Sequence, residues 1–272
     1  MELLRPSSLD ELDGAGVLLA GGTEVVPLLR DGILRTDTLV DVRAVVPRGV
    51  RDGCIGAGTT LADLESAPVP DALREACRLA ASPQLRHMGT VGGNLLQSTR
   101  CWYWRLRYPC RLHGGDRCHA AEGEHREHAI FANDFCASAH PSDVAAALLA
   151  LDARLHTTRR ELPLAELYRL PDEADRRTTT LEPGEAILEI EIPPVDASVY
   201  LKAMDRKRWS FPQVGVAAAR VAGGTRVALA GVAPIPWLLG GDGLDSASPL
   251  PRTAWKVDVA RALVGRALAD LG

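Results

Sequence analysis

The chain has 272 residues, which is long enough for two domains of about 150 residues each or for one large domain. Apolar residues make up 46% and charged residues 24%, a balance that excludes a disordered chain, and the net charge of −4 gives no indication of nucleic-acid binding. The longest apolar run, residues 144–151, is far too short to cross a bilayer, and the N-terminus has no secretory signal. We therefore expect no membrane span and a cytoplasmic location.

The first part of the chain predicts short strands that alternate with short helices. Periodicity and turn residues indicate strands at 16–19, 39–43 and 53–57, and helices at 24–30, 60–65 and 71–81. Thr23 is expected to cap the first helix. Two glycine segments interrupt this pattern, Ala-Gly-Gly-Thr-Glu at 20–24 and Gly-Thr-Val-Gly-Gly-Asn at 89–94.

The second part predicts an apolar helix followed by an antiparallel sheet. Ser142 or Asp143 is expected to cap a helix over 144–153, and the polar residues 160–182 indicate a loop. Further strands are expected at 186–192, 198–204, 214–221 and 225–232, and a helix at 254–271. We place a domain boundary between residues 160 and 175, which separates a mixed α+β region at 1–165 from a sheet-and-helix domain at 170–272.

The glycine segments are candidate anion sites. A strand, a tight Gly-Gly turn and a helix N-terminus together present backbone N–H groups to an anion, and Thr23 and Thr90 add hydroxyl donors. Neither segment matches GxGxxG or a Walker motif, which disfavours a Rossmann site and a P-loop. Two such segments favour a diphosphate ligand, and simple tight turns remain the alternative.

A cysteine-rich segment is the most unusual feature of the sequence. Residues 101–136 hold four of the six cysteines, four of the seven histidines and half of the twelve aromatic residues. The cysteine spacing, C-x8-C-x7-C-x17-C, has no CxxC pair, which disfavours a zinc ribbon, and a disulfide framework does not suit a signal-less chain of this size. An iron–sulfur cluster, a mixed Cys/His zinc site and no metal at all remain open. Cys54 and Cys77 are expected to be buried structural thiols.

Two charged residues are further candidates for ligand binding. Asp143 is placed either to cap its helix or to bind the hydroxyls of a ribose. Lys202 either faces a phosphate or a flavin, or is simply a surface charge on a strand. The sequence has no Ser/His/Asp group, paired-carboxylate site or HExxH motif. We therefore expect a bound cofactor to carry the chemistry, with the protein positioning it.

Taken in order, these motifs resemble the FAD-binding subunits of molybdenum hydroxylases, a family that includes the medium subunit of carbon monoxide dehydrogenase and the flavin domain of xanthine dehydrogenase. The resemblance implies an α+β fold, with a two-subdomain FAD-binding fold of the vanillyl-alcohol-oxidase type at 1–165 followed by a small antiparallel-sheet-plus-helix domain at 170–272. It implies FAD contacts from Ala20, Gly21, Gly22, Thr23, Glu24, Thr90, Gly92, Gly93, Asn94, Asp143 and Lys202. Glu24 stands where the family usually has Asp.

The insert at 98–138 is similar to one found in 4-hydroxybenzoyl-CoA reductases and in bacterial periplasmic aldehyde oxidoreductases. That resemblance implies one [4Fe–4S] cluster on Cys101, Cys110, Cys118 and Cys136, with the histidines of the segment at the surface or around the ligands. We expect aromatic residues to shield the cluster and few donors to reach its sulfurs.

The function implied by the resemblance is electron transfer. A large molybdopterin-binding subunit would oxidise or reduce an aldehyde, an aromatic acyl-CoA or an N-heterocycle. A small [2Fe–2S] subunit would relay electrons to the FAD of this chain, and a ferredoxin or another carrier would exchange them. The alternatives are a stand-alone flavin-dependent oxidase, for which no acid/base residues are evident, and a zinc-stabilised interaction module.

Overall fold

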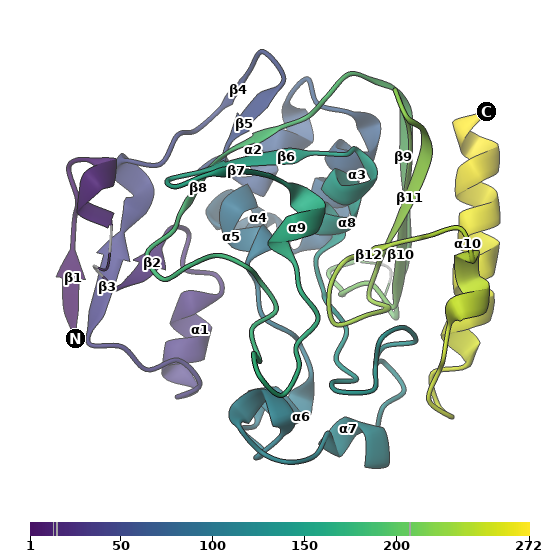
Figure 1. Cartoon of the computed structure of the whole chain (residues 1–272). Coiled ribbons are helices and arrows are strands. Elements are labelled where there is room, and N and C mark those ends of the chain that lie inside the picture. The colour runs from purple at the N-terminus through teal and green to yellow at the C-terminus, as the bar shows by residue number, and fades with distance from the viewer. Residues whose placement is uncertain (13, 15, 207) are drawn as a thin grey trace.

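The computed structural model describes residues 1–272 except 13, 15 and 207, and these residues form three sheets with helices around them (Figure 1). The smallest sheet is parallel, with the order β1-β3-β2, and is built from β1 (Glu2–Leu4), β2 (Val17–Leu19) and β3 (Thr38–Asp41). The 3₁₀ helices η1 (Leu9–Leu12) and η2 (Val42–Ala44) and the helix α1 (Val25–Arg30) flank its strands. Residue Glu24, not Thr23, takes the N-cap position of α1, and its side chain makes no capping bond.

The five-stranded sheet joins residues from distant parts of the chain. Its order is β4-β5-β8-β6-β7, all neighbours antiparallel, with β4 (Val50–Arg51), β5 (Cys54–Gly56), β6 (Arg154–Thr157), β7 (Glu161–Pro163) and β8 (Ile187–Glu191). The strand that we expected at 186–192, as part of the C-terminal domain, therefore lies inside this N-terminal sheet. A boundary that follows the sheets falls after Glu191, and the division at 165 and 170 stays a prediction.

The prediction of a loop over residues 160–182 was wrong for the first part of this segment. Residues there form β7 and the short helix α9 (Leu164–Leu167), whose Leu162, Leu164 and Leu167 are buried. The polar residues around them hid this short apolar pattern. From Tyr168 the chain continues as an irregular segment to β8, with one bridge between Tyr168 and Thr179.

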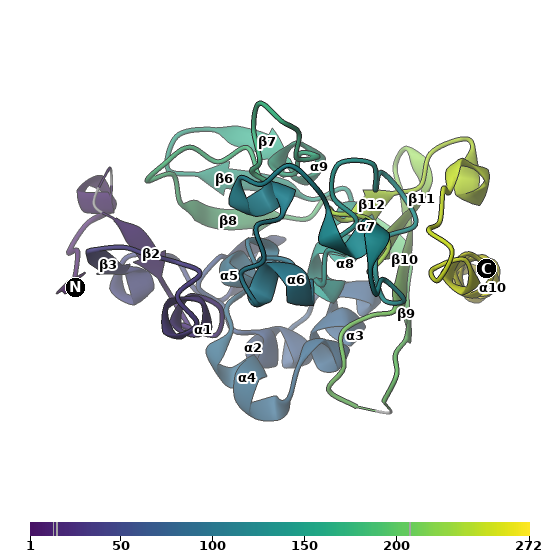
Figure 2. The same cartoon turned by 90° about the horizontal axis from the view of Figure 1, so that it is seen from below.

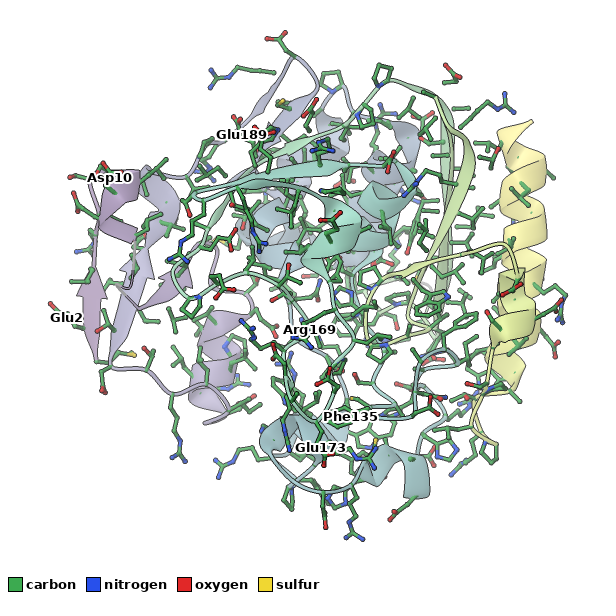
Figure 3. All side chains as sticks on the ribbon, in the orientation of Figure 1. Glu2, Asp10, Phe135, Arg169, Glu173 and Glu189 are labelled. Carbon is green, nitrogen blue, oxygen red and sulfur yellow. The ribbon has the colours of Figure 1, made fainter. Side chains whose placement is uncertain are left out.

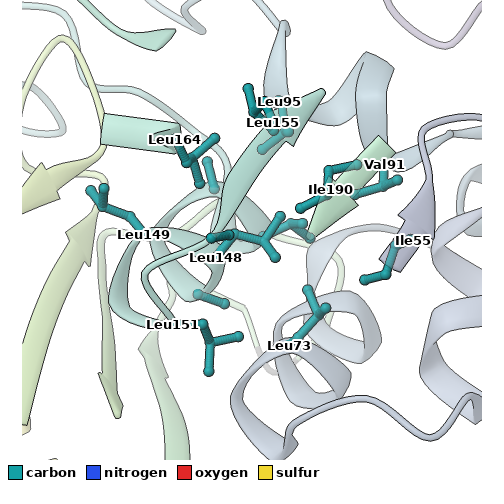
Figure 4. Packing of buried hydrophobic residues seen from close by; sticks show 14 of the residues in the cluster. Ile55, Leu73, Val91, Leu95, Leu148, Leu149, Leu151, Leu155, Leu164 and Ile190 are labelled. Atoms are coloured by element: carbon teal, nitrogen blue, oxygen red, sulfur yellow. The ribbon is translucent and has the colours of Figure 1, made fainter. Parts of the chain in front are cut away.

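Helix α8 (Asp143–Ala150) is the centre of the core. All of its residues are buried, because it packs on α3 and α5 and on the strands β10 and β11. Its leucines meet Leu73, Val91, Ile190 and other apolar residues (Figure 4). The surrounding helices are α2 (Leu61–Ser66), α3 (Asp71–Ala80), α4 (Pro83–Met88) and α5 (Val91–Leu95). A helix that is apolar on every side has this central place because no side of it can face water.

The four-stranded antiparallel sheet lies between two helical layers. Its order is β12-β11-β10-β9, with β9 (Val195–Ala203), β10 (Val214–Val221), β11 (Gly224–Ala230) and β12 (Trp237–Leu238). One face packs on α3 and α8, and the other is covered by α10 (Trp255–Leu271), which follows η4 (Gly243–Ser246). Since successive side chains of a strand point to opposite faces, Ala217 and Ala219 join the core around α8, whereas Val216 and Ala218 face α10.

The cysteine-rich insert forms a separate lobe at one end of the molecule. It contains α6 (Trp102–Arg105), η3 (Arg111–His113) and α7 (His119–Glu122). Figure 2 shows the small sheet and α10 on opposite sides, with the insert helices between them. The segment after α9 reaches the insert, since the Arg176 guanidinium donates to the carbonyls of Arg111 and Gly115, and Figure 3 shows Phe135 and Glu173 at this end.

None of the helices in the described ranges 1–12, 16–206 and 208–272 combines the length and the apolar character that crossing a bilayer requires.

The two glycine segments meet by a close backbone contact, which gives a first prediction. A Cβ built on Gly21 would lie 1.7 Å from the carbonyl oxygen of Met88, so Gly21→Ala forces the two segments apart. We expect the free energy of unfolding, measured with urea, to fall by about 1–3 kcal/mol. Gly223→Ala is the control, because a Cβ there meets no atom within 4 Å. Equal effects of the two substitutions would contradict this account of the contact.

Candidate functional site

The two glycine segments form one continuous surface. Besides the contact of Gly21 with Met88, the amide of Leu61 donates to the carbonyl of Gly89 at 3.0 Å, and Thr90 bridges to Thr60. Thr90 is the N-cap of α5, and its Oγ1 accepts from the amide of Gly93 at 3.2 Å. The second segment is therefore the start of a helix.

Two hollows lie on either side of this contact. The first, which we call the Asp143 hollow, has a volume of about 240 Å³, and the second, the Ala20 hollow, about 160 Å³. The two hollows share four lining residues, which are Thr23, Glu24, Thr90 and Gly93. Because they adjoin along these residues, the pair suits an elongated ligand with its middle at the glycine segments.

The structure brings together all but one of the residues that we expected to contact FAD. The Asp143 hollow is lined by Thr23, Glu24, Thr90, Gly93, Asn94 and Asp143. The Ala20 hollow is lined by Ala20, Gly21, Gly22, Thr23, Glu24, Thr90, Gly92 and Gly93. Lys202 is the exception, since it is absent from the described lining of both hollows and lies behind Asp143.

Asp143 and Lys202 form a buried ion pair. The Lys202 Nζ donates to Asp143 Oδ2 at 2.9 Å and to the carbonyl of Leu79, and Tyr200 donates its hydroxyl to Asp143 Oδ1 at 2.5 Å. Burial raises the pKa of Asp143 above its ordinary value, and the Lys202 ammonium and the Tyr200 hydroxyl offset part of that effect. Ser142, not Asp143, caps α8. Both carboxylate oxygens are thus bonded to protein, while Asp143 also lines the hollow, and Lys202 is not the surface charge that we weighed as an alternative.

Glu24 is held by two arginines. Arg100 and Arg105 approach its two carboxylate oxygens at 2.8 and 2.6 Å, and the amide of Ser98 donates to the same group at 3.1 Å. These contacts join the first glycine segment to the start of the insert. They also neutralise a carboxylate that would otherwise repel an anionic ligand in the adjoining hollows.

Sequence reasoning missed several residues that line the Asp143 hollow. Trp209 and Phe211 follow β9 and are 56% and 46% exposed at the rim, and the Arg100 guanidinium lies 4.9 Å from the centroid of the Phe211 ring. Exposed aromatic side chains at a hollow provide flat surfaces for stacking. In a chain that is only 4% aromatic, two such residues in one polar loop were a usable signal.

The four cysteines of the insert surround one small hollow, here called the cysteine hollow. Its lining includes Cys101, Cys110, Cys118 and Cys136. Within the described part of the chain, no group of three or more His, Cys, Asp and Glu side chains is placed to hold a metal ion.

Hydrogen-bond donors reach these sulfurs, contrary to the expectation that few would do so. His128 Nε2 lies 3.3 Å from Cys101 Sγ, and the amide of Ala137 donates to Cys118 Sγ at 3.5 Å. Burial raises the pKa of Cys101 to about 11, against which the backbone N–H groups of Tyr103 and Trp104 act. Donors directed at sulfur are characteristic of thiolate ligands.

Cys136 is likewise buried, with hydrogen-bonding groups close to its sulfur. Burial raises its pKa to about 12, and the backbone and side chain of Ser138 act against that shift. The Ser138 Oγ lies 3.3 Å from Cys136 Sγ. Without a metal these buried groups remain neutral thiols at pH 7, so a positively charged centre is needed to make them thiolates.

The histidines of the insert divide into two groups. His125 and His128 are buried, so neither takes the surface position that was one of the two expectations for these histidines. His128 touches a cysteine sulfur, whereas His125 bonds to the carbonyl of Ala120 and to the amide of Arg252. Among the aromatic residues, Tyr103 and Trp104 line the cysteine hollow, and Tyr108 is 43% exposed.

Comparisons with known proteins agree with this arrangement. A family model described as "FAD binding domain in molybdopterin dehydrogenase" matches residues 2–195. The aldehyde oxidoreductase FAD-binding subunit PaoB of Escherichia coli (strain K12) is 36% identical over 239 residues, which cover 80% of this chain and 75% of that protein. The carbon monoxide dehydrogenase medium chain of Hydrogenophaga pseudoflava is 35% identical over 96 residues, which cover 32% of this chain and 33% of that one.

Solved structures show the same fold. Carbon monoxide dehydrogenase from Hydrogenophaga pseudoflava matches with a TM-score of 0.70 at 24% identity, over 100% of this chain and 96% of the other. Quinoline 2-oxidoreductase from Pseudomonas putida 86 matches with a TM-score of 0.67 at 17% identity, again over 100% and 96%. The expected α+β fold is confirmed. The chain belongs to the FAD-binding medium subunits of the molybdenum hydroxylase family, which are components of oxidoreductases.

The buried ion pair behind the Asp143 hollow gives a second prediction. Lys202→Met leaves the Asp143 carboxylate buried without its cation, and we expect the free energy of unfolding to fall by about 3–5 kcal/mol in a urea titration. Replacing both partners together, as Asp143→Leu with Lys202→Met, is expected to cost less than the single change. Arg266→Met is the control, because its pair with Asp270 is exposed. If the loss of stability in the double variant equals the sum of the losses in Asp143→Leu and Lys202→Met, the two residues are not coupled and this account is contradicted.

Proposed function

We propose that this chain is the FAD- and [4Fe–4S]-carrying electron-transfer subunit of a multi-subunit molybdenum hydroxylase. The observation that carries the proposal is the pair of adjoining hollows, which meet at the contact of two glycine segments and lie in the same chain as a cysteine-lined hollow. The membership of the family supports the flavin part of this proposal, and the geometry of the insert supports the cluster part.

The residues present fit FAD. Backbone N–H groups at the Gly21–Gly22 turn and at the start of α5 suit the diphosphate, and the Thr90 hydroxyl, which only accepts in its bond with Gly93, keeps its own hydrogen to donate. Asp143 offers a carboxylate to a ribose or ribityl hydroxyl, and Trp209 and Phe211 offer aromatic faces at the rim. When bound, the flavin supplies one- and two-electron transfer. The chain's own residues bind it, orient it and neutralise Glu24 beside it.

The insert fits a [4Fe–4S] cluster better than a zinc ion. A [4Fe–4S] cluster is held by four cysteine thiolates, and four cysteines line this one hollow. Structural zinc sites usually carry closely spaced cysteine pairs, and the cysteines of the insert form no CxxC pair. The donors directed at Cys101, Cys118 and Cys136 also match thiolate ligands.

We infer three partners from the same argument. The hollows offer flavin-binding groups, and substrate chemistry would take place on a large molybdopterin-binding subunit, with a small [2Fe–2S] subunit between the two. The substrate class extends over aldehydes, aromatic acyl-CoA thioesters and N-heterocycles. The cluster would provide a one-electron exit near the surface of the insert, suited to a ferredoxin. A stand-alone flavin oxidase is the second candidate, and turnover of a substrate by the isolated chain would favour it.

The flavin proposal is tested by extraction. We expect one FAD, and no FMN, per chain after mild purification, identified by chromatography of the released flavin. Thr90→Val should weaken FAD binding by about 1 kcal/mol for one neutral hydrogen bond, and by about 1.5–3 kcal/mol if the partner is a phosphate oxygen. Thr225→Val, on the exposed end of β11, should leave the affinity unchanged. Recovery of FMN, or of no flavin, would overturn the proposal.

The cluster proposal is tested by iron and sulfide analysis of anaerobically purified protein. About four iron and four labile sulfide are expected per chain. Cys136→Ser should abolish the cluster and leave FAD in place, since Cys136 is not among the described residues that line either of the two hollows for FAD. Cys54→Ser, a cysteine of β5 away from the insert, is the matched control and should keep full iron content. Stoichiometric zinc without iron, or a full cluster in Cys136→Ser, would refute this part.

A further inference from the structure

His128 is held rigidly against one of the four cysteines. Its side chain is buried, its Nε2 lies 3.3 Å from Cys101 Sγ, and the ring meets the Trp102 indole edge-on with the centroids 4.9 Å apart. A cysteine thiolate can only accept a hydrogen bond, so an imidazole fixed at this distance donates to it through the nitrogen that faces the sulfur.

The second ring nitrogen supports this assignment of the proton. His128 Nδ1 is buried and has no hydrogen-bond partner in the described part of the protein. The ring borders a hollow of about 70 Å³, which Arg100, His140 and Gln213 also line. No acceptor in the described part of the protein requires a hydrogen on Nδ1, so the ring can carry its hydrogen on Nε2, directed at Cys101.

A buried lysine fixes the backbone that carries His128. Lys256 of α10 is fully buried, and its Nζ donates to the carbonyls of Glu127 at 3.1 Å, His128 at 2.9 Å and Gly231 at 2.5 Å. All three ammonium hydrogens are therefore used on backbone oxygens. A buried ammonium is costly unless it is fully bonded, and here its bonds tie the insert to the C-terminal helix.

We propose that His128 donates a hydrogen bond from Nε2 to the Cys101 sulfur and thereby raises the reduction potential of the cluster, with Lys256 as the positioning residue that holds His128 in place. The proposal rests on the proposed [4Fe–4S] site. One-electron reduction increases the negative charge on the cluster and its ligand sulfurs, and a hydrogen bond to sulfur stabilises the reduced state more than the oxidised one. This donor therefore favours reduction of the cluster.

The test is a redox titration of the purified holoprotein, with the reduced cluster followed by electron paramagnetic resonance. His128→Leu removes the donor and should shift the midpoint potential downward. If the bond contributes a tenfold preference for the reduced state, the shift is about 59 mV for one electron. His128→Gln, which can place an amide N–H near the sulfur, should restore most of the potential.

Two further variants make the test specific. Lys256→Met should lower the potential in the same direction, because it frees the backbone of His128. His125→Leu removes another buried histidine of the insert that contacts no cysteine, and it should leave the potential unchanged. An unchanged potential in His128→Leu with full iron content would overturn the proposal. The proposal would also be overturned if His128→Gln lowered the midpoint potential as much as His128→Leu does, or if His125→Leu lowered it by that amount.

The same samples separate this inference from the proposed cluster. Wild-type protein without iron contradicts the cluster itself, whereas wild-type protein with a full cluster and an insensitive potential contradicts only the role of His128. If His128→Leu loses its iron, His128→Gln and Lys256→Met are compared with wild type instead. A lowered potential in Lys256→Met together with a near-normal potential in His128→Gln then supports the role of His128.

Discussion

The arrangement of the site depends on the close backbone contact between Gly21 and Met88. No side chain fits between these two segments, so the first glycine turn and the start of α5 lie against each other and share the lining of both hollows. An elongated anionic ligand needs donors along its middle and space at both ends, and this contact provides that shape. Glycine is required here for the approach of two backbones, and at Gly22 also for a positive φ of 71°.

A charge cluster connects this contact to the insert. Glu24 belongs to the first glycine segment, and its partners Arg100 and Arg105 flank the first cysteine of the insert. Arg100 borders the Asp143 hollow, and the next residue, Cys101, borders the cysteine hollow. The wall between the two hollows is thus little more than one peptide unit at this point. A carboxylate held between two guanidiniums fixes that peptide in position more firmly than a single exposed ion pair would.

The sequence predicted the residues of the site better than the way in which they are held. Glycine segments, an apolar helix and a cysteine-rich insert are local patterns, so each of them can be recognised in the sequence alone. The pairing of β8 with β5 was missed, because register between strands some 130 residues apart leaves no trace in a single strand's alternation. The buried contact of Lys202 with Asp143 was missed for the same reason, since the two residues lie 59 positions apart in the chain.

Two buried lysines show what the C-terminal elements contribute. Lys202 of β9 reaches back to Asp143 behind the Asp143 hollow, and Lys256 of α10 reaches the carbonyls of the insert behind the cysteine hollow. Each ammonium is fully enclosed, and each would be destabilising if its partners moved, so each fixes the distance between the C-terminal sheet or helix and one of the two hollows. The sheet and α10 pack on each other through an apolar layer, which makes the two lysines parts of one rigid support. This apolar layer therefore supports both the Asp143 hollow and the cysteine hollow, although it lies outside the glycine segments and the insert.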